Sequence, residues 1–202
     1  DLIIGVYYLK NDKFDLAKKY FKKIDNKNSQ FLINNFLSKS LLNWSSFKSK
    51  NFKEAQNDID RIEQRFSNLK KIQNTFLHCF YGSHKTEDFY KNLSSKDETN
   101  LSRYNYFYAL YLFDKNKSNQ ANQVVESALE LYPRNLLLNQ YIIDKDTGKF
   151  QNYFNCKNTT HVIAEILYIV ANALSSQNIY TFSNFYLNLS KYLNEDFYSF
   201  DT

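Results

Sequence analysis

Glycine and proline are very scarce in this chain, with three glycines and one proline in 202 residues. Proteins of the sandwich, barrel and propeller kinds need frequent turns, which these two residues commonly supply. Hydrophobic residues make up 43% of the chain and charged residues 23%, which is enough apolar material for a buried core. The scarcity of turn residues therefore predicts an all-α protein.

Small residues recur along the chain at a spacing that is typical of paired helices. Each is followed by a large apolar residue four positions later and by a small or apolar residue seven positions later. Two antiparallel helices approach closely only where small side chains face each other. The four anchor residues are Ala17, Ala55, Ala121 and Ser183. Their separations of 38, 66 and 62 residues fit one repeat of about 34 residues followed by two double repeats.

This pattern resembles the tetratricopeptide repeat (TPR), which places a large and a small residue together in its first helix, as at Ile4-Gly5 and Tyr108-Ala109. The only proline, Pro133, stands where that family ends the second helix of a unit. The resemblance implies a right-handed α-solenoid of antiparallel helix pairs, a TPR-like superhelix of about five pairs plus one extra helix. Residues 1–202 would then form a single helical-repeat domain. Its units would lie at about 1–31, 32–66, 69–98, 99–134 and 159–194, with an irregular segment at 135–158.

Asparagine and lysine are unusually frequent, with 26 and 22 copies. This bias is typical of an AT-rich coding genome, and the last TPR-like unit resembles the tail of bacterial TPR proteins. The chain begins inside the first predicted repeat, so we expect it to be a fragment of a longer chain. For its compartment we favour the cytoplasm, with the periplasm as the alternative, because a missing N-terminal segment would hide a signal peptide.

The resemblance also predicts a binding surface, because the first helix of each TPR pair lines a concave groove. The positions that correspond to the groove are mostly apolar or aromatic, which suits an extended peptide or a partner helix. For the single tryptophan, Trp44, packing against an adjacent helix is the alternative. The TPR domains that hold chaperone C-termini use a carboxylate clamp, which this sequence cannot assemble. The predicted groove residues are Val6, Trp44, Phe47, Tyr106, Leu110, Phe113, Tyr168 and Asn172.

The sequence contains none of the common catalytic motifs: no Gly-x-Ser-x-Gly, no His-Glu-x-x-His and no glycine-rich phosphate loop. His78, Cys79 and His84 lie close together, but a structural zinc site needs four ligands. We therefore predict no enzyme activity, no cofactor and no metal site. Cys79 and Cys156 are 77 positions apart without a CxxC motif, and we interpret both as buried thiols.

These observations predict a non-catalytic protein–protein interaction scaffold that binds a peptide or a partner helix. One alternative is binding of a polyanion or nucleic acid, since the net charge is +5 and several lysines cluster. These are Lys18, Lys19, Lys22, Lys23, Lys70 and Lys71. An obligate structural subunit of a complex is a third hypothesis. Neither end of the repeat array carries a polar cap, which predicts that flanking sequence or self-association with a second copy of the chain covers at least one end. The sequence contains no apolar stretch long enough to span a membrane.

Overall fold

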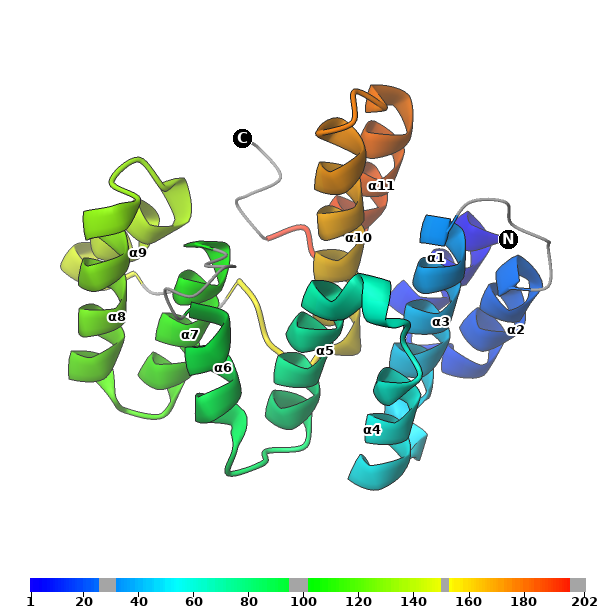
Figure 1. Cartoon of the computed structure of the whole chain (residues 1–202), viewed down its shortest axis with the longest axis horizontal. Coiled ribbons are helices and arrows are strands. Elements are labelled where there is room, and N and C mark those ends of the chain that lie inside the picture. Colours follow the sequence, from blue (N-terminus) through cyan, green and yellow to red (C-terminus); the bar gives the residue numbers. More distant parts are fainter. Residues whose placement is uncertain (26–31, 95–101, 150–152, 197–202) are drawn as a thin grey trace.

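The computed structural model describes residues 1–25, 32–94, 102–149 and 153–196, and all regular elements in these ranges are helical (Figure 1). This confirms the prediction of an all-α fold. The α-helices are α1 (Leu2–Lys10), α2 (Phe14–Asp25), α3 (Leu32–Ser46), α4 (Phe52–Asp60), α5 (Ser67–Phe80), α6 (Thr86–Ser94), α7 (Ser102–Asp114), α8 (Ser118–Leu131), α9 (Leu136–Thr147), α10 (Thr159–Ser175) and α11 (Tyr180–Leu193). Two short 3-10 helices cover Phe47–Ser49 and Gln64–Phe66.

Ten of these helices form pairs of sequence neighbours in contact, namely α1–α2, α3–α4, α5–α6, α7–α8 and α10–α11. The small anchor residues lie inside the pairs, where Ala17, Ala55 and Ala121 are fully buried. Gly5 of α1 faces the ring of Phe21 in α2, and a β-carbon at Gly5 would come within 2.4 Å of that ring. Small residues are therefore needed where the two helices of a pair approach most closely.

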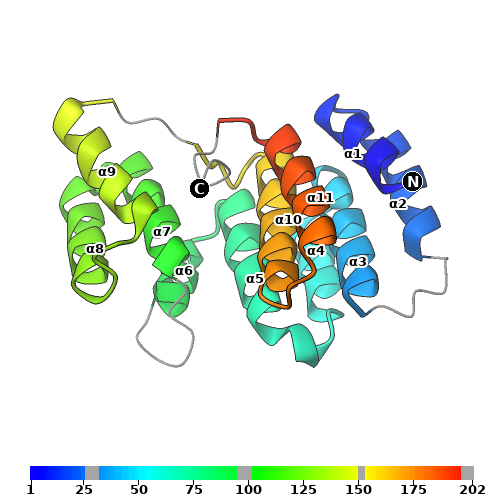
Figure 2. The same cartoon turned by 90° about the horizontal axis from the view of Figure 1, so that it is seen from above.

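The last helix pair does not continue along the row of the preceding pairs. α10 packs against α3 and α11 contacts α1, so the α10–α11 hairpin folds back onto the first part of the chain. In both views it lies beside α3 and α5 rather than next to α9 (Figures 1 and 2). The sequential stacking predicted for the fifth pair is not what the structure shows. A physical reason is that α10 is apolar on most of its surface, and a helix of this kind is stable only when it is covered on several sides.

Four of the five pairs within the described ranges are joined by the same tight turn. In each, a residue with a left-handed backbone donates its N–H to the carbonyl three residues back, and the next residue donates to the carbonyl five residues back. This is the Schellman motif, which satisfies the free carbonyls of a helix end and favours Gly, Asn or Asp. The left-handed residues are Asp12, Gly82, Asn116 and Asn178. The same turn, with Gly148 in the left-handed position, ends α9.

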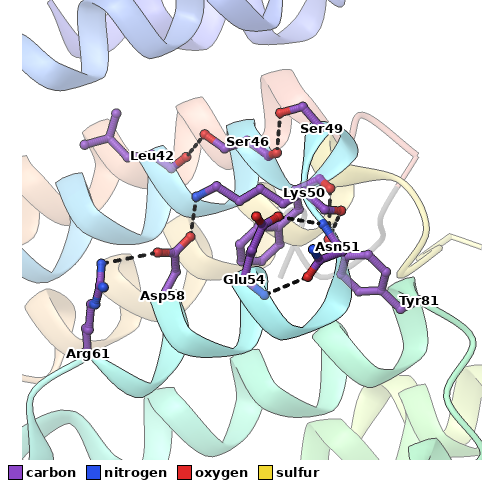
Figure 3. A network of polar contacts seen from close by, with 10 residues as sticks. Leu42, Ser46, Ser49, Lys50, Asn51, Glu54, Asp58, Arg61 and Tyr81 are labelled. Carbon is purple, nitrogen blue, oxygen red and sulfur yellow. Dashed lines mark hydrogen bonds and ion pairs between the residues drawn. The ribbon is translucent and has the colours of Figure 1, made fainter.

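The turn between α3 and α4 is different, because it contains the 3-10 helix Phe47–Ser49 and is held by side chains (Figure 3). The hydroxyl of Tyr81 lies 2.9 Å from the carbonyl oxygens of both Phe47 and Lys50 and donates to them. Asn51 and Glu54 form a reciprocal capping box at the start of α4, and Lys50 pairs with Asp58. The side chain of Tyr81, which follows α5, thus fixes the turn of the preceding pair.

Several large apolar side chains remain exposed at the N-terminal edge of the molecule. Ile3, Ile4 and Tyr7 lie on one side of α1 and are 59%, 42% and 53% exposed. This exposure is what an uncapped end implies, while self-association through it stays a prediction. The described helices include none that combines the length and the hydrophobicity needed to cross a membrane.

Candidate functional site

The α10–α11 hairpin contacts α1, α3 and α7, which are first helices of their pairs and carry most of the predicted groove residues. The carboxylate of Glu165 in α10 is buried and accepts two hydrogen bonds from Arg103 of α7, Nε to Oε1 at 2.8 Å and Nη2 to Oε2 at 2.7 Å. The hydroxyl of Tyr104 donates a third, at 3.1 Å. The guanidinium of Arg103 also lies 3.9 Å from the ring centre of Tyr168. A bidentate pair with this much support fixes α10 against α7.

The segment that leads into α10 also packs against the first part of the molecule through Tyr153 and Phe154, which are buried. The ring of Phe154 lies between Phe76 of α5 and Phe107 of α7, with centroid distances of 4.9 and 4.4 Å. Asn194, which follows α11, donates a buried hydrogen bond of 2.8 Å to the carbonyl of Tyr153. The hairpin therefore contacts the first part of the molecule through both its helices and its leading segment.

A disulfide bond joins Cys79 of α5 to Cys156 in the same leading segment, with the two Cα atoms 5.9 Å apart. The prediction of two buried free thiols is therefore wrong. The reason is the fold-back of the last pair, which brings together residues 77 positions apart. A sequence spacing of that length gives no indication of contact.

The eight predicted groove residues do not share one surface. Val6, Trp44, Phe47, Tyr106 and Leu110 are buried, Phe113 and Tyr168 are half-buried, and Asn172 is exposed. Trp44 packs against Phe47 and Phe80, and its Nε1 donates a 3.0 Å hydrogen bond to Oε1 of Gln73 in α5. Packing against an adjacent helix was the alternative for this residue, and it is what the structure shows. A partner cannot reach the five buried side chains unless helices separate, so they are core residues here.

An open groove of about 520 Å³ lies elsewhere, between α6, α7 and α8. This is within the size range of small-ligand sites, about 300–1,000 Å³. Apolar side chains contribute part of its surface, and amide, hydroxyl and charged side chains contribute the rest. The apolar residues are Leu112, Val124, Ala128 and Leu131. The polar residues are Glu87, Lys91, Ser94, Asn105, Tyr108, Gln120, Gln123 and Ser127.

The charged rim of this groove centres on Glu87 of α6. Its carboxylate accepts hydrogen bonds from Lys117 at 2.6 Å and pairs with Lys91 at 3.2 Å. The hydrogen bond from Lys117, opposed by burial and aided by Lys91, holds the pKa of Glu87 below its ordinary value. Burial, together with the nearby charge of Glu87, raises the pKa of Tyr108. At neutral pH Glu87 is ionised and Tyr108 is protonated, so the rim offers fixed hydrogen-bonding groups rather than a group that readily exchanges a proton.

His78, which precedes Cys79, packs against aromatic side chains. His78 is buried, stacks on Phe89 at a centroid distance of 4.0 Å and meets the edge of Phe52 at 5.0 Å. Burial and the charge of Lys85 lower the pKa of His78. In the ranges that the structure describes, no group of three or more His, Cys, Asp or Glu residues is arranged to hold a metal ion.

Sequence reasoning missed both the buried Arg103–Glu165 pair and the groove over α7. A signal for the pair was present, because Glu165 interrupts the most apolar stretch of the chain and the sequence has only four arginines. A charged residue inside such a stretch needs a buried partner of opposite charge. The groove left no such signal, because its exposed amides resemble the many other asparagines and glutamines of the surface.

Comparison with protein-family models, with curated proteins and with solved structures finds no match for this chain.

Proposed function

We propose that this chain is a non-catalytic helical-repeat scaffold, similar to TPR proteins, and that it binds an extended peptide segment of a partner in the groove between α6, α7 and α8. The observation that carries the proposal is the mixed lining of that groove, in which amide and hydroxyl groups lie beside apolar side chains. Peptides present the same combination, a polar backbone with apolar side chains.

The spacing along α8 supports an extended ligand. Gln120, Gln123, Ser127 and Leu131 follow one another at intervals of three or four residues, which places them on one face of the helix. The stripe from Gln120 to Leu131 is about 16 Å long, the length of about five residues of extended chain. Each glutamine amide carries a donor and an acceptor, as does each peptide unit. The stripe thus matches a short extended segment in both length and hydrogen-bonding groups.

The α10–α11 hairpin explains why we assign the ligand to this groove and not to the predicted concave face. The first helices α1, α3 and α7 each contact that hairpin, through packing or through the Arg103–Glu165 pair. A partner peptide on that face would have to displace a helix whose residues are mostly buried. The groove over α7 is open without any such rearrangement.

The lysine cluster supports the polyanion alternative less well. Lys18 pairs with Asp15 at 2.7 Å, and the ammonium of Lys23 lies 4.6 Å from the ring centre of Tyr20. Part of the positive charge of α2 is thus already engaged within the helix. Binding of an extended peptide in the groove is the hypothesis that we retain.

A displayed library of random linear peptides, selected against the whole chain, tests the proposal. Ser127→Trp places an indole in the groove, and Asn119→Trp places the same side chain on α8 outside the residues that line it. We expect Ser127→Trp to weaken binding of the selected peptides at least tenfold and Asn119→Trp to leave it unchanged. Selection of no peptide, or equal binding by both variants, would contradict the proposal.

A further inference from the structure

The two cysteines of the disulfide differ in their exposure to solvent. Cys79 lies in the last turn of α5 and is 5% exposed. Cys156 lies in the turn before α10, is half-buried, and is flanked by the exposed residues Asn155 and Lys157. Of the two residues, Cys156 is thus the one with more surface exposed to an external reagent, while Cys79 is buried.

We propose that this disulfide is a site of thiol–disulfide exchange, in which Cys156 reacts with an external disulfide or thiol and Cys79 is the resolving cysteine. The proposal does not depend on the peptide-binding function. Disulfides persist in oxidising compartments and are rare in the reducing cytosol. The chain is therefore expected to acquire this bond in an oxidising compartment, and the co-reactant is a disulfide of low molecular mass or of a thiol oxidant protein.

Formation of the bond proceeds in two exchange steps. The Cys156 thiolate attacks one sulfur of the external disulfide, whose other sulfur leaves as a thiolate and takes up the proton that Cys156 has lost. The Cys79 thiolate then attacks Sγ of Cys156 in the mixed disulfide, and the second external sulfur leaves and takes up the proton from Cys79. Two cysteine thiols are oxidised and one external disulfide is reduced to two thiols. Reduction of the bond is the reverse, with the first attack at Cys156.

The turn around Cys156 is held by contacts that do not require the disulfide. The N–H of Asn155 donates to Nδ1 of His161 at 3.2 Å, and the N–H of Lys157 donates to Oδ1 of Asn155 at 2.8 Å. Phe154, two residues earlier, packs between α5 and α7. These contacts keep Cys156 near Cys79 after reduction, so exchange can take place reversibly in the folded protein.

Oxidised glutathione, added to the reduced and folded chain, tests which sulfur reacts first. By intact mass we expect the wild type to lose two hydrogens without keeping an adduct. Cys79→Ser, which retains the accessible Cys156, should gain one glutathionyl group. Cys156→Ser, which retains the buried Cys79, should react at least tenfold more slowly. Equal rates for the two variants, or a wild type that stays in the dithiol form, would overturn the proposal.

Two measurements on the wild type test the proposal without a variant, and so do not depend on whether the variants fold. Closing a loop of 77 residues predicts that reductant lowers the Tm by roughly 10 °C. Chain isolated from its native cells in the presence of an alkylating reagent should carry no alkylated cysteine until it is reduced. An unchanged Tm, or two alkylated cysteines before reduction, would show that the bond is not formed or has no role in the native protein.

Discussion

Two glutamates, one in each half of the molecule, pair with basic side chains at very different depths. The closed half consists of α1–α5 covered by the α10–α11 hairpin, and the open half consists of α6–α9 (Figure 1). Glu165 lies on α10 of the closed half, where its side chain is 1% exposed, and it binds Arg103 and Tyr104 of α7, so this pair links the closed half to the open half. In the open half the Glu87 side chain is 23% exposed and binds Lys117 and Lys91.

Burial, rather than the number of partners, should decide what each glutamate contributes. A buried ion pair loses much of its hydration, and removing one partner leaves the other charge without compensation. A partly exposed pair regains water when it breaks. The packing of the closed half against α7 is therefore expected to depend on the buried Arg103–Glu165 pair, while the charges around Glu87 can become hydrated and rearrange at little cost.

The largest expected effect is that of Glu165→Gln. This change keeps the shape of the side chain but removes the buried carboxylate that forms the bidentate ion pair with Arg103. We expect the free energy of unfolding to fall by about 3–5 kcal/mol, as measured by urea titration. The double variant Arg103→Met, Glu165→Leu should recover most of this loss, because it removes both charges together. A loss below about 1 kcal/mol for Glu165→Gln would show that the pair is not buried as described.

The free energy of unfolding should depend on groups of the two halves in different pH ranges. Burial lowers the pKa of His78 in α5 and of His161 in α10 below the ordinary value of 6.5. Below about pH 6.5 the unfolded chain then binds protons that the folded chain does not, so stability falls as the pH falls. For Glu87 the pKa is also lowered, and its contribution is lost only as the pH falls below the ordinary value of 4.5. Between pH 7 and 5 the loss should therefore arise in the closed half.

Chemical denaturation at several pH values measures this effect. The slope should not exceed about 1.4 kcal/mol per pH unit for each histidine. His161→Gln should flatten the profile between pH 7 and 5, and Glu87→Gln should leave that range unchanged. A profile that is flat in the wild type would contradict the lowered pKa of both histidines.

Glu87→Gln is the matched counterpart of the first variant and should have a much smaller effect. Its lysine partners are 42% and 58% exposed and can be hydrated when the carboxylate is removed. We expect a loss of less than about 1 kcal/mol in the same urea titration. A loss as large as that of Glu165→Gln would remove the distinction between a closed and an open half.

Local features of this fold could be predicted from the sequence, because they depend on residues close together in the chain. The small residues at Ala17, Ala55 and Ala121 placed three helix pairs correctly, since close approach of two helices excludes larger side chains. Asn51 starts α4 and Gly82 ends α5, as capping and turn preferences predict.

The fold-back of α10–α11 and the binding surface could not be predicted in the same way. The contacts that hold the hairpin link residues far apart, such as Arg103 with Glu165 and Cys79 with Cys156, and helical periodicity carries no information about such pairs. For the groove positions the difficulty is chemical. An apolar residue on the first helix of a pair, such as Trp44, has the same pattern whether it faces a ligand or a neighbouring helix.

The smallest expected effect concerns a feature that the two halves share, the left-handed turn within a helix pair. Asn116 joins α7 to α8 in the open half, and Asn178 joins α10 to α11 in the closed half, with φ angles of 58° and 60°. Glycine adopts this conformation without a steric penalty but loses more chain entropy on folding. Asn116→Gly should therefore raise the free energy of unfolding by about 0.5 kcal/mol or leave it unchanged. Asn178→Gly should gain less, because its Oδ1 accepts a hydrogen bond from the hydroxyl of Tyr180. A clear loss of stability at Asn116 would show that its turn lacks the left-handed geometry common to the other pairs.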